Sequence, residues 1–138
     1  MLRNRGGFNL VEIMVVIVVF GIVAAIGVPG FSSYVRSNRL STSVSRLAAD
    51  LQMARSTAIA NSRVIQVTAS GSGYSITDLS TGNVITNRNL ESGCELAADV
   101  TVRFFPWGMA DAGAFNVAGC SGATRSITLL PTGIVEVD

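Results

Sequence analysis

The sequence of 138 residues contains no histidine, no lysine and only two cysteines. Without histidine, the usual general base and the Ser/His and Cys/His pairs of hydrolytic enzymes are absent. Cys94 and Cys120 do not have the spacing of a metal site, and no Walker or Rossmann glycine pattern occurs. The acids Glu91, Glu95 and Asp99 are expected to form one acidic stretch of a loop. The sequence therefore predicts a protein that is not an enzyme and that needs no metal or cofactor.

Polar side chains are almost absent from residues 8–28, where Asn9 and Glu12 are the exceptions. This tract has 21 residues. A helix of about 20 residues crosses the roughly 30 Å of a bilayer core. A core helix of a soluble protein would have a polar face, and this tract has none. Arg3 and Arg5 precede it, so the positive-inside rule predicts a cytoplasmic N-terminus and an exported C-terminal part.

Both cysteines lie in the part that is predicted to be exported. In an oxidising compartment such a pair usually forms a disulfide. Closing a loop of this length would stabilise the fold by about 3 kcal/mol on the chain-entropy estimate. The alternative is a pair of free, buried thiols.

The N-terminal signal has two interpretations. Residues 25–27, Ala-Ile-Gly, would be a weak site for a secretory peptidase that cuts behind the apolar region. The stretch "RGGFNLVE" fits a different arrangement, with a Gly-Gly pair before the apolar tract and Glu12 five residues after Gly7. This arrangement resembles the type III signal of bacterial type IV prepilins and pseudopilins. We favour the second interpretation because a basic leader, a glycine, an aromatic residue and a glutamate at that offset coincide.

The resemblance implies that a membrane prepilin peptidase removes residues 1–7, cuts between Gly7 and Phe8, and methylates Phe8. Glu12 would then be the fifth residue of the mature protein. A carboxylate inside an apolar segment costs about 2.5 to 3.5 kcal/mol unless it finds a partner. In the family, this glutamate is thought to neutralise the N-terminal amine of a neighbouring subunit during filament assembly. The alternative is that Glu12 snorkels to the cytoplasmic interface, about one helical turn away.

The pattern beyond the apolar tract predicts that one helix runs from Phe8 to about Asn61, about 80 Å at 1.5 Å per residue. Pro29 removes one backbone hydrogen bond and is expected to kink or loosen the helix, as often found in type IV pilins. Apolar residues then recur at spacings of three and four, at Leu40, Val44, Leu47, Leu51, Ala54 and Ala58. The opposite face is expected to carry Arg36, Arg39, Arg46 and Asp50.

The end of this helix reads "LQMARSTAIANS". It resembles the segment shared by FimT/FimU minor pilins and GspH-type pseudopilins, where a Leu-Gln-x-Ala-Arg-Ser-x-Ala pattern leads into the first strand. The matching residues are Leu51, Gln52, Ala54, Arg55, Ser56 and Ala58. Small residues here would let a sheet approach the helix closely. A generic amphipathic helix is the alternative for this segment taken alone.

From residue 63 the apolar pattern changes to short runs of β-branched residues separated by turn signals. Strands are predicted at 63–70, 73–79, 84–90, 101–105, 114–118, 125–130 and 134–137. Pro131, Thr132 and Gly133 are expected to turn the last two into a hairpin. The prediction is an α+β protein with the type IV pilin fold, a long helix packed on a small antiparallel β-sandwich. Its expected parts are a leader (1–7), an assembly segment (8–28), an amphipathic segment (29–62) and a head (63–138).

The stretch "RFFPWGMADAG" holds more apolar side chains than a solvated loop needs. Alternation should place some of Phe104, Phe105, Trp107 and Met109 in the core. We expect Trp107 to pack in the core or within the loop. The alternative is that it is exposed as an anchor for an interface.

The resemblance implies a structural minor pilin of a tip or initiation complex that primes pilus assembly. It would lie in the inner membrane with a periplasmic head, and its partners would be other minor and major pilins and the prepilin peptidase. A GspH-type pseudopilin of type II secretion is the main alternative. A major pilin ranks lower because its disulfide usually closes the C-terminal segment, whereas 18 residues follow Cys120.

DNA is not an expected partner. DNA-binding relatives have a Gly-Arg-x-Arg motif near the C-terminus, and Gly133 here is followed by Ile134 and then Glu136, where arginines would stand. Residues 63–138 contain four arginines and seven acids, a net charge of −3, and phosphate binding needs the opposite sign.

Overall fold

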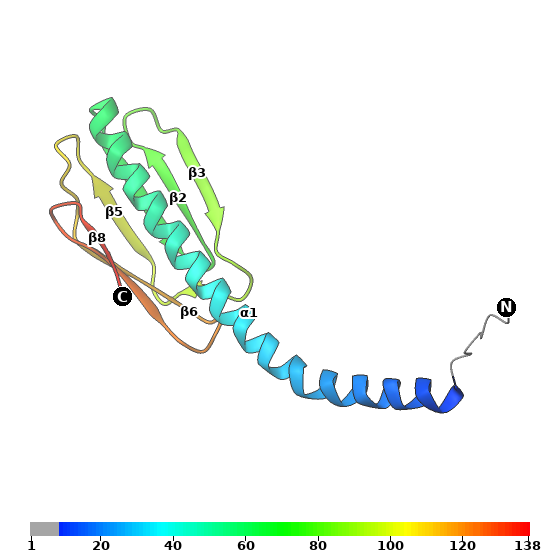
Figure 1. Ribbon diagram of the computed structural model, residues 1–138. Coiled ribbons are helices and arrows are strands. Elements are labelled where there is room, and N and C mark those ends of the chain that lie inside the picture. The colour runs from blue at the N-terminus through cyan, green and yellow to red at the C-terminus, as the bar shows by residue number, and fades with distance from the viewer. Residues whose placement is uncertain (1–8) are drawn as a thin grey trace, which may run out of the picture. The chain divides into compact units, whose positions relative to one another are not determined.

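The computed structural model describes residues 9–138, apart from the side chains of Val28 and Pro29. Within this range the chain forms helix α1 (Leu10–Asn61) and then eight strands (Figure 1). The backbone divides into two compact units, one that ends at Val35 and one that spans Arg36–Asp138.

Helix α1 is assigned without a break through position 29. A break of the helix at Pro29 is therefore not present, and the kink or loosening predicted there stays a prediction. The helix ends where Ser62 adopts a left-handed conformation, with φ of 52°. The amides of Ser62 and Arg63 donate to the carbonyls of Ile59 and Ala58, the two hydrogen bonds of a Schellman cap. The predicted C-terminal end of the helix at Asn61 is confirmed.

The head contains two antiparallel sheets. The first has the order β3-β2-β1-β5 and is formed by β1 (Ile65–Ser70), β2 (Gly73–Asp78), β3 (Val84–Asn89) and β5 (Val100–Phe104). The second has the order β4-β6-β7-β8 and is formed by β4 (Glu95–Leu96), β6 (Gly113–Ala118), β7 (Arg125–Leu129) and β8 (Val135–Val137). All seven predicted strands are present. The sequence did not predict β4, because a two-residue strand is too short to show alternation.

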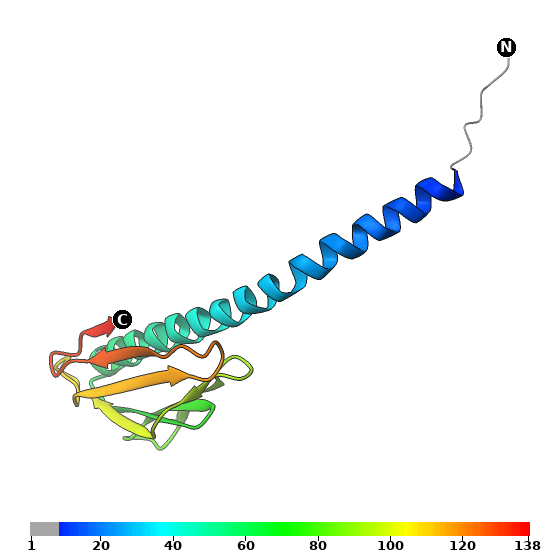
Figure 2. The same cartoon turned by 90° about the horizontal axis from the view of Figure 1, so that it is seen from below.

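The hairpin between β7 and β8 is confirmed. Gly133 donates its amide to the carbonyl of Leu130 at 2.8 Å, and Leu130 donates to Ile134 at 2.9 Å. The two strands pair antiparallel from Leu129 and Val135 onward. Figure 2 shows them in orange and red.

One core joins both sheets to the part of α1 that belongs to the second unit. Alternate strand residues are buried, as for Ile65, Val67 and Ala69 in β1, because successive side chains point to opposite faces of a sheet. The helix contributes the predicted face, Leu40, Val44, Leu47, Leu51, Ala54 and Ala58, which are all buried. In the view of Figure 1 this part of the helix runs between β5 on one side and β2 on the other. The α+β class and the type IV pilin architecture are confirmed.

Candidate functional site

The apolar side chains of the first unit are exposed. From Leu10 to Ile26 the large apolar residues of α1 are half to three-quarters accessible, on every side of the helix. In the described part of the chain, α1 is the one helix long and apolar enough to cross a membrane, and none of its most apolar stretch is buried. Such a surface needs lipid or protein to cover it.

Glu12 lies in the first turn of α1 and is exposed. Its amide donates to the carbonyl of Asn9 at 2.9 Å, so the backbone at Glu12 is already helical. Gly7 and Phe8, the residues of the predicted cut and methylation, lie outside the described residues. The pairing of Glu12 with an amine of another subunit stays a prediction.

The disulfide between Cys94 and Cys120 is present, with Cα atoms 4.4 Å apart, so the alternative of two free thiols is wrong. Both cysteines are buried in the core of the head. The bond joins the residue just before β4 to the loop just after β6. Gly119 adopts φ of 92°, and a Cβ at this position would lie 2.6 Å from the carbonyl oxygen of Gly93. A glycine is therefore needed next to the bridge for the two loops to approach.

Arg55 fastens the end of α1 to two loops of the head. Its Nε donates to the carbonyl oxygen of Gly108 at 3.0 Å, and its Nη2 donates to that of Thr132 at 3.1 Å. Ala54 and Ala58 beside it are buried, so the helix lies close to the sheets, as the small residues predicted. The sequence marked Arg55 as part of a family pattern but did not give its partners. The glycines at the turn positions 108 and 133 were the sequence signal that two loops come close to Arg55.

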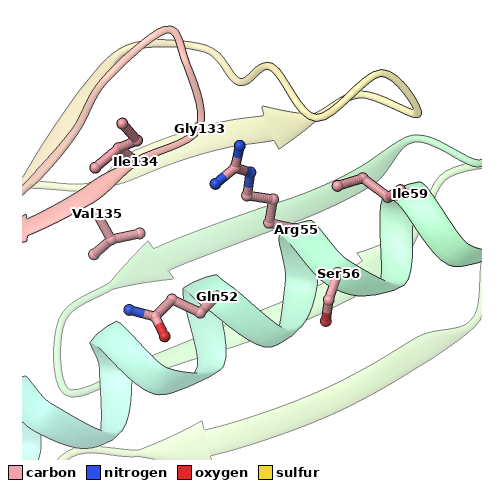
Figure 3. Close-up of a pocket in the computed structure, with 7 residues that line it drawn as sticks. All are labelled: Gln52, Arg55, Ser56, Ile59, Gly133, Ile134 and Val135. Atoms are coloured by element: carbon pink, nitrogen blue, oxygen red, sulfur yellow. The ribbon is translucent and has the colours of Figure 1, made fainter.

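An open groove of about 390 Å³ lies beside Arg55. Its lining comes from one face of α1 and from the β7–β8 turn with the start of β8, namely Gln52, Arg55, Ser56, Ile59, Gly133, Ile134 and Val135 (Figure 3). Gly133 closes the groove against Arg55, because a Cβ there would lie 2.7 Å from the Arg55 Nε. The groove holds no carboxylate and no thiol, so its lining offers no acid–base pair for catalysis.

Asp50 corrects the prediction for the polar face of the helix. Asp50 is buried, with 8% of its surface exposed. Its carboxylate accepts a hydrogen bond from the Tyr74 hydroxyl at 2.6 Å and forms an ion pair with Arg88, whose Nε is 3.4 Å away. Asp50 follows Leu47 by three residues and precedes Ala54 by four, so it lies at the border of the buried face. Burial raises the pKa of the Tyr74 hydroxyl above its ordinary value of 10.0, and the hydrogen bond and charge of Asp50 raise it further.

Trp107 corrects one part of a second prediction, because it is 68% exposed and packs within its loop instead of in the core. Packing of Trp107 in the core was wrong, and of the four large apolar side chains at 104, 105, 107 and 109 only Phe104 is buried. Trp107 lies in a turn in which Gly108 donates its amide to the carbonyl of Phe105 at 2.9 Å. The two aromatic rings stack with centroids 5.1 Å apart. The exposed indole is therefore held in place by its neighbour.

The three acids predicted in one loop have different surroundings. Glu91 forms an ion pair with Arg46 at 3.1 Å, Glu95 begins strand β4, and Asp99 is exposed just before β5. Ile134 and Glu136, where DNA-binding relatives would have arginines, are both exposed.

Two family models match the chain. The model described as "Type II transport protein GspH" matches residues 43–133, and the model described as "Prokaryotic N-terminal methylation motif" matches residues 2–28. A comparison with curated proteins gave no match. These matches cover most of the helix and nearly the whole head.

The fold is similar to that of solved minor pilins. One crystal structure of the type IV minor pilin FimU of Pseudomonas aeruginosa (strain PAO1), in space group P21, matches with a TM-score of 0.62 and 21% identity, over 76% of this chain and 92% of that one. A second crystal form of FimU, in space group P65, matches with a TM-score of 0.59 and 21% identity, over 72% and 92%. The chain belongs to the GspH family and is a type IV pilin-like protein of the FimT/FimU/GspH group.

Proposed function

We propose that the chain is a structural minor pilin that joins an initiation complex at the tip of a type IV pilus and primes filament growth. The observation that carries the proposal is the exposed apolar surface of α1 from Leu10 to Ile26. In one continuous helix this surface precedes a segment that packs into the head. A subunit of this kind covers its apolar surface with lipid before assembly and with neighbouring helices afterwards.

Processing prepares this surface for assembly. Prepilin peptidase cuts between Gly7 and Phe8 and methylates Phe8, and the apolar tract stays attached to the head. The cut creates a positively charged amine close to Glu12 in sequence. In the filament, Glu12 of one subunit offsets the amine of its neighbour, which removes the cost of a lone carboxylate in an apolar surrounding. The partners are other minor and major pilins.

The protein enters the inner membrane with its N-terminus in the cytoplasm and its head in the periplasm. Arg3 and Arg5 support this orientation. The disulfide supports it independently, because such bonds persist in oxidising compartments. The absence of histidine from the sequence and the structural roles of the family support a protein without enzymatic activity.

A pseudopilin of type II secretion is the second candidate, and the family match to the GspH description favours it. Pro29 and the cysteine pair favour the pilus instead. Deletion of the gene in the native host separates the two. Loss of twitching motility with normal protein secretion supports the pilus role. Normal twitching with loss of secretion supports the pseudopilin and contradicts the proposal.

DNA binding for natural transformation is a weaker candidate, because the head carries a net charge of −3 over residues 63–138. An electrophoretic shift of DNA by the protein at moderate salt would revive it. No shift is the expected result, because phosphate needs a basic surface.

A further inference from the structure

The positive charge of Arg55 is partly buried and is not offset by an acid. Within residues 9–138, four arginines form ion pairs with carboxylates. The arginines of this range that form none are Arg36, Arg39, Arg55 and Arg125. Arg55 alone among these is not exposed. Backbone carbonyls accept hydrogen bonds from its guanidinium but leave the charge in place, so an anion beside it is favoured.

The guanidinium of Arg55 keeps free donors at its outer edge. An arginine has five N–H groups, and two of these are used, from Nε to Gly108 and from Nη2 to Thr132. The other three, on Nη1 and Nη2, donate to no residue in the described part of the chain. Figure 3 shows the guanidinium reaching from α1 toward the turn at Gly133, where Arg55 lines the groove. The Nη1–Nη2 edge has the fork geometry that binds both oxygens of a carboxylate.

The rest of the groove lining is neutral and partly apolar. Gln52 lies three residues before Arg55 and is exposed, and its amide offers both donors and an acceptor. Ile59 and Ile134 are 47% and 48% exposed, and Val135 completes the apolar part. The volume of about 390 Å³ lies in the range of small-ligand sites. The groove therefore fits the end of a chain better than a folded surface.

We propose that the groove binds the carboxyl end of a peptide chain of a partner protein, with an apolar last residue. The terminal carboxylate accepts from the Nη1–Nη2 edge of Arg55, and none of the described residues that line the groove is an acid that would repel it. The last side chain contacts Ile59 and Ile134, and the Gln52 amide pairs with the peptide backbone. A fatty acid has the same carboxylate and apolar chain, but it has no amide to match Gln52.

The inference goes beyond the proposed function, because it assigns a ligand to the head and does not concern the helix contacts that build a filament. It applies equally to a pilin and to a pseudopilin.

The test is a titration of the full chain in detergent micelles, followed by NMR of isotope-labelled isoleucine methyl groups. Ile59 and Ile134 report on the groove, and Ile85, an exposed residue of β3, reports non-specific binding. Each signal is assigned by replacing that isoleucine with valine. The probes are acetyl-Gly-Gly-Leu with a free carboxyl group, the carboxamide of the same peptide, and acetyl-Gly-Gly-Gly with a free carboxyl group.

The free acid that ends in leucine should shift the Ile59 and Ile134 signals to saturation and leave the Ile85 signal unchanged. The carboxamide should bind at least about tenfold more weakly, because it lacks the charge and the second oxygen of the bidentate pair. The peptide that ends in glycine should bind at least about threefold more weakly, because it buries no apolar side chain.

A charge placed in the groove tests the same pairing from the protein side. Gln52→Glu should weaken binding of the free acid at least about fivefold, because two carboxylates then compete for Arg55. Asn116→Asp is the matched control, since it adds the same charge at an exposed position of β6 outside the groove, and it should have no effect. The remaining methyl signals, recorded without peptide, report that both variants are folded.

Equal binding of the free acid and its carboxamide overturns the proposal, because the charge of Arg55 then has no part in binding. The absence of shifts at Ile59 and Ile134 also overturns it, as does unchanged affinity in the Gln52→Glu variant. Tighter binding of octanoate than of the leucine peptide overturns it as well, since the groove would then select a lipid acid.

Discussion

The guanidinium of Arg55 on α1 donates from Nε to the carbonyl oxygen of Gly108, 3.0 Å away, and so joins the helix to the loop that carries Trp107. Gly133 lies against the same guanidinium, and a Cβ at Gly133 would collide with the Gly108 carbonyl oxygen. The end of the helix, the Trp107 loop and the β7–β8 turn therefore form one connected corner of the head.

Gly133→Ala should lower the free energy of unfolding by more than the cost of placing an alanine at a positive φ. Its φ is 77°, and Gly122 has nearly the same φ, 75°, with open space around it. Gly122→Ala is the matched control, and a left-handed residue with a side chain costs about 1 to 2 kcal/mol. Gly133→Ala should cost at least about 1 kcal/mol more, because overpacking displaces Arg55. Urea unfolding measures the difference, and equal destabilisation by the two variants would show that the corner is not tightly packed.

The buried pair of Tyr74 and Asp50 should make stability depend on alkaline pH. The pKa of Tyr74 is raised in the folded protein above the ordinary value of 10.0. The unfolded chain then loses its proton first as pH rises, so the stabilisation is complete below about pH 10 and decreases above it. Tyr74→Phe should be less stable at neutral pH, because Asp50 loses its hydrogen-bond donor. Its unfolding free energy should fall less steeply above pH 10, and parallel pH curves for both proteins would contradict the assignment.

Loss of the disulfide should destabilise the head without affecting membrane insertion. Cys94 and Cys120 are 26 residues apart, and the chain-entropy estimate for such a loop is about 3 kcal/mol. The double variant Cys94→Ser with Cys120→Ser should unfold at lower urea concentration and still fractionate with membranes. Two thiols that react with an alkylating reagent in native protein, before reduction, would refute the bond.

Replacement of Gly7 by leucine should block processing, because glycine allows the extended backbone that a peptidase needs at the cut. Full-length precursor should then accumulate in the membrane. Gly21→Ala is the control, since a Cβ at Gly21 meets no neighbour and the position is remote from the cut. Normal shortening and methylation of the Gly7→Leu variant would place the cut elsewhere.

The features that could be predicted from the sequence are those that follow from the periodicity of apolar residues. The apolar spacing from Leu40 to Ala58 identified the buried face of α1 because a helix has a fixed repeat, and the strands followed from alternation and turn residues. The burial of Asp50 could not be predicted, since it depends on Tyr74 and Arg88 from strands distant in sequence. The core alternative for Trp107 was wrong because composition indicates that a loop is apolar but not which of its side chains faces out. The partners of Arg55 likewise required the tertiary arrangement.

In the proposed mature protein the apolar helix is kept, methylated Phe8 is the first residue and Glu12 is the fifth. N-terminal sequencing and intact mass of the protein from its native host test this directly. We predict a chain that starts with N-methylated phenylalanine, lacks residues 1–7, and is two hydrogens lighter than the reduced form because of the disulfide. A soluble periplasmic chain that begins after Gly27, without the apolar helix, would contradict the account.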